Sequence, residues 1–283
     1  MRIPESCAKC LYDKQQHLTD DKEYLSEIKA IIDNRAEDDT SPYLVYQFGQ
    51  VYEKCFGMRA SYKAEKKKYN DLVLSMENKI REKIEESKDP LGTALAYSRA
   101  GNYIDFGAMN EVDEDTFMSL IKDVEVKDRD KEAIDSFVKQ LGEAERFLLI
   151  TDNCGEIVLD KLFIEQLKKH FPHLDIKTLV RGSDVLNDAT MQDAEYVGID
   201  KLAKVISNGT SVAGTVYSMI TDEAREAIDH ADVILAKGQG NYESMCRQGR
   251  HVFYSFLCKC ELFMNRFNAA KLTGIFVEEK DAV

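Results

Sequence analysis

Polar side chains that could bind a metal ion or an anion follow four short apolar runs in the second half of the chain. The runs cover residues 147–150, 176–180, 205–206 and 233–236. Carboxylate and amide oxygens are ligands for hard divalent cations, and Arg and Lys bind anions. The candidate residues at the four run ends are Asp152, Asn153, Glu156, Arg181, Asn187, Asp188, Asn208, Gly209, Lys237 and Gly238.

The spacing of the four runs predicts how these residues come together. Segments with helix-like periodicity separate the runs, and this alternation is typical of a mostly parallel sheet wound with helices. Ligands of such sheets bind at the carboxyl ends of the strands, where all four polar clusters fall. We therefore expect one pocket that holds a divalent cation and an anionic substrate.

Within that pocket, Asp152, Asn153 and Asp188 are the expected metal ligands. Asp152 and Asp188 are also the candidate catalytic residues, and the nucleophile is either water or Asp152 itself. Oxygen-only coordination suits Mg²⁺ or Mn²⁺, with water and a substrate phosphate completing the shell. The alternative is that Asp152 or Asn153 caps the following helix.

A phosphate group could be bound at the predicted helix starts after Gly155, Gly209 and Gly240, because helix N-termini attract anions. Arg181 and Lys237 would then neutralise its oxygens. Alternatively, these two basic residues pair with the carboxylates of the site and contact no ligand.

Several nucleotide-binding and nucleophile motifs do not fit. Residues 238–243 read Gly-Gln-Gly-Asn-Tyr-Glu, with Glu in place of the third Gly of a dinucleotide fingerprint. No Walker A sequence and no Gly-x-Ser-x-Gly elbow occurs. The position two residues after Asp152 is Cys154, where a haloacid-dehalogenase-like site would have a second Asp.

Composition narrows the class of partner. The 283 residues carry a formal net charge of −13, which repels nucleic acid and anionic membranes. No apolar stretch approaches the roughly 18 residues that span a bilayer, and no signal-peptide pattern opens the chain. We expect a cytoplasmic enzyme whose partner is a small metabolite, with neither nucleic acid nor membrane bound.

The pattern divides the chain into a helical domain, 1–140, and an α/β domain, 141–283. The residue run 66–68, Lys-Lys-Lys, is expected to be a solvated helix face. In the helical half, the segment at 100–108 contains Asn102, Asp105 and two glycines, and it either caps a helix junction or lines the pocket. The expected elements of the α/β half are strands at 146–151, 176–181, 204–207, 232–237 and 251–257, and helices at 156–171, 189–198, 211–230 and 241–247.

Four cysteines lie near the ends of the chain, in Cys7-x-x-Cys10 and Cys258-x-Cys260. Four thiolates could hold a structural metal if the two ends meet. A redox pair and plain reduced cysteines are the alternatives.

Six motifs together resemble the damage-control phosphatase family, long catalogued as a domain of unknown function, DUF eighty-nine. In order they are Cys-x-x-Cys, Ala-Gly-Asn-x-Ile-Asp-Phe-Gly, Asp-Asn-x-Gly-Glu, Arg-Gly-x(4)-Asn-Asp-Ala-Thr, Ser-Asn-Gly and Lys-Gly-Gln-Gly-Asn-Tyr-Glu. The resemblance is to the compact prokaryotic branch and spans almost the whole chain.

The resemblance implies a Rossmann-like α/β/α sandwich with a mostly parallel sheet, preceded by an all-helical domain. It implies hydrolysis of small phosphorylated metabolites with Mn²⁺, Co²⁺, Ni²⁺ or Mg²⁺ held by Asp152, Asn153 and Asp188. Asn102, Glu156, Asn187 and Lys237 are the implied substrate-facing positions. A non-catalytic metabolite-binding protein and an S-adenosylmethionine-dependent methyltransferase remain alternatives, and the sequence leaves the oligomeric state open.

Overall fold

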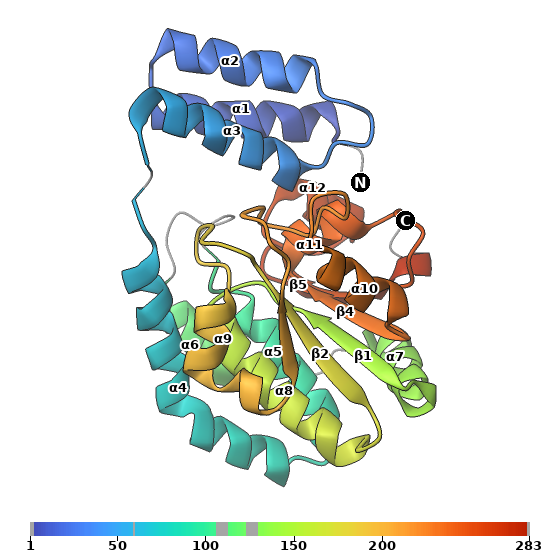
Figure 1. Cartoon of the computed structure of the whole chain (residues 1–283). Helices are drawn as coiled ribbons and strands as arrows, with labels where there is room; N and C mark the ends of the chain where they lie inside the picture. The colour runs from blue at the N-terminus through green and yellow to red at the C-terminus, as the bar shows by residue number, and fades with distance from the viewer. Residues whose placement is uncertain (1–2, 59, 106–112, 123–129, 282–283) are drawn as a thin grey trace.

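A six-stranded sheet forms the centre of the molecule (Figure 1). The computed structural model describes residues 3–58, 60–105, 113–122 and 130–281. The strand order is β3-β2-β1-β4-β5-β6, and only β6 is antiparallel to its neighbour. This confirms the predicted mostly parallel sheet. The strands are β1 Arg146–Ile150, β2 Asp175–Val180, β3 Lys204–Ser207, β4 Val233–Lys237, β5 Phe253–Leu257 and β6 Gly274–Glu278.

Helices cover both faces of the sheet. Side chains that alternate along each buried strand therefore pack into one of two hydrophobic cores. In β1, Phe147 and Leu149 belong to one hydrophobic core, whereas Leu148 and Ile150 belong to the other. On the first face lie α4 Lys63–Glu86, α5 Pro90–Gly101, α6 Glu114–Lys122, α7 Lys131–Glu143, α8 Glu156–His170 and α9 Met191–Val197. On the second lie α10 Asp222–His230, α11 Gly238–Met245 and α12 Glu261–Arg266.

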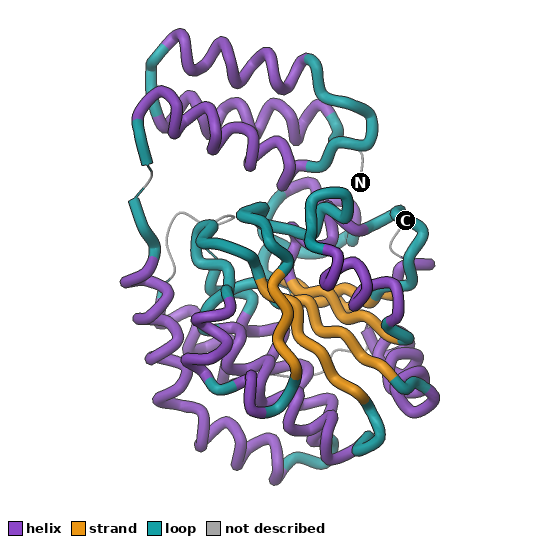
Figure 2. The backbone as a smooth tube through the Cα atoms, viewed as in Figure 1, coloured by secondary structure: helices purple, strands orange, loops and turns teal. Residues whose placement is uncertain are grey.

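Three N-terminal helices form a separate layer above the rest of the molecule (Figures 1 and 2). They are α1 Glu5–Leu18, α2 Lys22–Asp33 and α3 Ser41–Phe56, and they share a core that includes Tyr24 and Phe48. Helix α3 packs against α11. The predicted division near residue 140 stays a prediction, because packing within one structure does not test which segments fold independently.

The structure corrects the predicted helix at 211–230, which is helical only in α10. Residues 211–221 form a loop that packs tightly on α11. A Cβ on Gly214 would lie 2.8 Å from the Gly240 carbonyl oxygen, and the Thr215 amide donates to Ser244 Oγ. These contacts hold the segment in a non-helical path. Helix α12 and the antiparallel strand β6 were not predicted.

The lysine run at 66–68 is not a uniformly solvated face. Lys66 is buried and forms ion pairs with Asp184 at 2.8 Å and Asp193 at 2.7 Å. It thereby ties α4 to the loop that follows β2. Among the described residues, no helix is both long and apolar enough to cross a membrane.

Candidate active site

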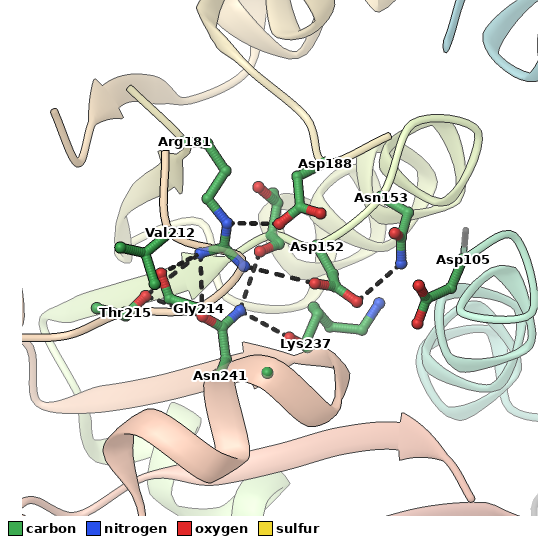
Figure 3. Close-up of polar contacts among 12 residues, drawn as sticks. Asp105, Asp152, Asn153, Arg181, Asp188, Val212, Gly214, Thr215, Lys237 and Asn241 are labelled. Atoms are coloured by element: carbon green, nitrogen blue, oxygen red, sulfur yellow. Dashed lines mark hydrogen bonds and ion pairs between the residues drawn. The ribbon is translucent and has the colours of Figure 1, made fainter. Parts of the chain in front are cut away.

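The predicted polar clusters meet where the strand order reverses between β1 and β4, the usual ligand site of an open α/β sheet. The backbone after β1 runs alongside the loop after β2. Asn153 and Asp188 form an antiparallel bridge, and Ala189 N donates to the Asp152 carbonyl at 2.8 Å. The pairing places the side chains of Asp152, Asn153 and Asp188 in one cluster (Figure 3).

Asp152 is held by donors from three segments of the chain. Its Oδ2 accepts from Asn102 Nδ2 at 3.0 Å and from Asn153 Nδ2 at 2.7 Å, and its Oδ1 accepts from an Arg181 terminal nitrogen at 3.4 Å. A Cβ on Gly238, at φ +80°, would lie 2.0 Å from Oδ2. Residue 238 must therefore be glycine for the start of α11 to lie this close to the carboxylate.

Arg181 is almost completely buried, and its contacts match the alternative of pairing with site carboxylates. Nε donates to Asp188 Oδ2 at 2.7 Å, and a terminal nitrogen donates to Asn241 Oδ1 at 3.0 Å and to the Gly214 carbonyl at 3.1 Å (Figure 3). The predicted contact between Arg181 and phosphate therefore has no support in this arrangement. Asn241 and the loop at 214–215 were not singled out from the sequence.

Lys237 is likewise enclosed by protein groups. Its Nζ lies 2.7 Å from both Glu156 Oε1 and Asp160 Oδ1, and 2.8 Å from Ser98 Oγ. The side chains of Lys237, Glu156 and Asp160 are all 0 % exposed. Lys237 and Glu156 were predicted to face the substrate. In the structure they belong to a buried ion network that joins α5, α8 and β4.

Burial dominates the electrostatics of the carboxylates in and beside the site. It raises the pKa of Asp188 to about 6, against the lowering effect of Arg181. The pKa of Asp152 is raised well above its usual value by burial and then by the charges of Asp188 and Glu156. Burial also raises the pKa of Asp160 to about 6, although Lys237 lowers it. Carboxylates with pKa values raised in this way release protons when a cation binds.

The residues at the strand ends fit a hard divalent cation. Two carboxylates, Asp152 and Asp188, lie beside the amide oxygen of Asn153, which is buried and has no hydrogen-bond partner. A buried acceptor without a donor is costly unless a cation or an ordered water satisfies it. Within the described ranges, no group of three or more His, Cys, Asp or Glu side chains is arranged as a metal site. The candidate donor set therefore consists of two carboxylates and one amide oxygen.

The loop after β3 positions the remaining predicted residues. Asn208 Oδ1 accepts from the backbone amides of Gly182 and Thr210, each at 2.9 Å, and its Nδ2 is buried without a partner. A Cβ on Gly182 would lie 2.2 Å from the Gly209 backbone, so the loops after β2 and β3 touch. Asn187 Nδ2 donates to the Ile104 carbonyl at 2.9 Å, which ties the site to the segment after α5.

Of the three predicted helix starts, only that of α8 falls directly after its glycine, Gly155. Helix α11 begins at Gly238, so Gly240 lies inside it, and a loop follows Gly209. The predicted phosphate contacts at Gly209 and Gly240 are therefore wrong as helix N-termini.

The segment after α5 reaches the site as expected for a lining role. Asn102 donates to Asp152, and Asp105 lies beside Asn153 in Figure 3. Asp105 forms an ion pair with Lys259 at 2.6 Å, and the Lys259 side chain is 0 % exposed. Lys259 follows β5 within the Cys-Lys-Cys motif and was not among the residues predicted from the sequence. Residues 106–108 of the predicted lining segment lie outside the described residues.

In the part of the chain that the structure describes, the four cysteines are not arranged as a metal site. Cys258 is buried in the core of the second face, whereas Cys10 and Cys260 are exposed. Cys7 contacts Ser41 Oγ at 3.5 Å, and burial raises its pKa to about 11.

Comparisons with known proteins agree on one family. Residues 2–272 match the family described as "Damage-control phosphatase ARMT1-like domain". An uncharacterized protein of Methanocaldococcus jannaschii is 30% identical over 92% of this chain and 90% of its own length. A protein of Archaeoglobus fulgidus named "Damage-control phosphatase" is 28% identical over 92% of this chain and 93% of its own.

Two Pyrococcus horikoshii matches agree with these. A protein named as a damage-control phosphatase is 34% identical over 59% of this chain and 58% of its own length. The crystal structure of a DUF89 family protein superimposes with a TM-score of 0.75 at 25% identity, covering 99% of both chains.

Proposed function

The chain belongs to the family of damage-control phosphatase ARMT1-like domains, and from that premise we propose that it is a metal-dependent phosphatase of small phosphorylated metabolites. The relatives named damage-control phosphatases support a phosphatase with a role in metabolite repair. The metal dependence is carried by one observation in this chain: the unpartnered, buried amide oxygen of Asn153 between two aspartates.

Asp152, Asn153 and Asp188 would hold the divalent cation, for which Mn²⁺, Mg²⁺, Co²⁺ and Ni²⁺ are candidates. When bound, such a cation supplies Lewis-acid polarisation of a phosphoryl oxygen. Arg181 fixes both aspartates through separate nitrogens, so their orientation does not depend on the ligand. Their burial excludes bulk water, which strengthens electrostatic interactions with the substrate.

Lys259 is our candidate for the substrate phosphate. Unlike Arg181 and Lys237, its ion pair is with Asp105 and not with Asp152, Asp188 or Glu156. Asp105 contributes to the raised pKa values of both Asp152 and Asp188, so the pair lies within electrostatic reach of the metal ligands. A phosphate that exchanged places with Asp105 would gain a buried, charge-assisted contact.

Replacing Lys259 by Met should raise KM for a phosphomonoester by about tenfold or more, with a smaller effect on kcat, because binding energy to phosphate is lost. Steady-state kinetics measure this split. The matched control is Lys204→Met, which removes an exposed lysine paired with Glu223 at the start of β3. Equal KM values for the two variants would remove Lys259 from the site.

One panel tests the proposed function against its rivals. Purified protein is incubated with a library of phosphometabolites with and without Mn²⁺, and phosphate release is measured. Calorimetry against S-adenosylmethionine is run beside it. We expect phosphate release that requires Mn²⁺. Binding of S-adenosylmethionine, or metabolite binding with no turnover of any library member, would contradict the proposal.

A further inference from the structure

The amide of Asn153 is oriented by a neighbour that does not face the ligand. Asn153 Nδ2 donates to Glu156 Oε2 at 3.0 Å and to Asp152 Oδ2 at 2.7 Å, and the Asn153 backbone amide donates to Glu156 Oε2 at 3.3 Å. Ionised carboxylates only accept hydrogen bonds. Both carboxylates therefore accept hydrogen bonds from the nitrogen of the Asn153 side-chain amide. The amide oxygen must then point away from these two carboxylate oxygens (Figure 3).

The opposite orientation would be unfavourable. Rotating the amide by half a turn would place Asn153 Oδ1 at the present position of Nδ2. The oxygen would then face two other acceptors, Asp152 Oδ2 and Glu156 Oε2. The buried Nδ2 would then face the position now held by the unpartnered oxygen. An amide nitrogen in that position carries only donors and cannot bind a cation.

Glu156 is itself held in place by Lys237 and Asn102. Its Oε1 accepts from Lys237 Nζ at 2.7 Å, and its Oε2 accepts from Asn102 Nδ2 at 3.0 Å. The side chain is 0 % exposed, and Lys237 balances its charge. Both carboxylate oxygens of Glu156 therefore have protein hydrogen-bond partners and need no ligand.

We propose that Glu156 is a positioning residue that sets the orientation of Asn153, so that the amide presents its oxygen to the divalent cation. The proposal rests on the proposed function for the place of the cation. It assigns Glu156 a task different from the substrate-facing position that the family resemblance implied.

The substitution Glu156→Gln places a hydrogen-bond donor where Asn153 now meets an acceptor. Lys237 has only donors, so it retains the glutamine oxygen at the position of Oε1. The glutamine NH₂ group then lies at the position of Oε2, facing the backbone amide and Nδ2 of Asn153. Donor now faces donor at this position, whereas Asp152 still accepts from Nδ2. The Asn153 amide then has no single favoured orientation, and its oxygen is no longer held toward the cation.

The test is Mn²⁺ affinity, measured without substrate by the loss of the free-Mn²⁺ electron paramagnetic resonance signal. Glu156→Gln should weaken Mn²⁺ binding at least about tenfold, the usual effect of losing a residue that orients a metal ligand. The control is Glu165→Gln on the same helix, where the glutamate pairs with Arg81, and it should leave Mn²⁺ affinity unchanged.

The same substitution in an Asn153→Asp background separates the effect of Glu156 on the orientation of residue 153 from any direct effect of Glu156 on the cation. Asn153→Asp supplies two equivalent oxygens, so orientation no longer matters. In this background Glu156→Gln should cost much less Mn²⁺ affinity than it costs in the wild type, because only the loss of one negative charge, itself paired with Lys237, remains. If Glu156→Gln alone does not fold, Asn153→Ala replaces it: unchanged Mn²⁺ affinity in that variant would overturn the inference, because it removes the oxygen that Glu156 is proposed to orient.

An equal loss of Mn²⁺ affinity in both backgrounds would overturn the inference, as would unchanged affinity in Glu156→Gln alone. Failure of the proposed function is seen separately, as wild-type protein that binds Mn²⁺ but releases no phosphate from the metabolite panel.

Discussion

Asp188→Asn should lower kcat/KM with Mn²⁺ by about 100-fold or more, equivalent to roughly 2.7 kcal/mol in the transition state. The substitution keeps an acceptor for Arg181 Nε, which lies 2.7 Å from Asp188 Oδ2, so the fold should be retained. It removes one of the two carboxylates proposed to hold the cation. Steady-state kinetics on a generic aryl phosphate, over a range of Mn²⁺ concentrations, measure the loss.

Asp184→Asn is the matched control for this variant. Asp184 lies in the same loop after β2, but it is exposed and pairs with Lys66, which keeps its second partner Asp193. We expect kinetics close to those of the wild type. If Asp188→Asn also turned over normally, Asp188 would not be a metal ligand.

Lys237→Met should lower the free energy of unfolding by about 3–5 kcal/mol, the usual cost of removing one partner from a buried ion pair. Glu156 and Asp160 would keep buried carboxylates without their shared cation. Their charges would then stay unpaired or take up protons, and either outcome opposes folding. Urea denaturation followed by circular dichroism measures the change.

Two variants complete this experiment. Lys204→Met removes an exposed ion pair and should cost at most about 1 kcal/mol. Adding Asp160→Asn to Lys237→Met should recover part of the lost stability, because one uncompensated charge is removed. A Lys237→Met variant of near wild-type stability, with a raised KM, would instead assign Lys237 to the substrate.

The sequence predicted which strand-end residues come together better than it predicted the direction of their side chains. Asp152, Asn153 and Asp188 come together because parallel strands bring their carboxyl ends to one edge, which a pattern of apolar runs reveals. Whether Arg181 and Lys237 face a ligand or a carboxylate depends on tertiary contacts. For Lys237 these contacts come from Ser98 on α5, far away in sequence, and from Asp160, which lies within a helical pattern.

The missed elements have similar causes. Residues 211–221 have a composition compatible with a helix, but the contacts of Gly214 and Thr215 with α11 hold them in a loop. Lys66 lies in a lysine run that predicts a solvated face, yet Asp184 and Asp193 approach it from the loop after β2 and from α9. Periodicity within one segment carries no information about such partners.

Metal add-back to the wild-type protein tests the central claim most directly. The protein is stripped with a chelator and titrated with Mn²⁺, while bound Mn²⁺ and the rate of phosphate release are measured on the same samples. We predict negligible release without metal and a rate that rises in parallel with binding of one Mn²⁺ per chain. Full activity in the stripped protein, or Mn²⁺ binding that leaves the rate unchanged, would contradict a metal-dependent phosphatase at this site.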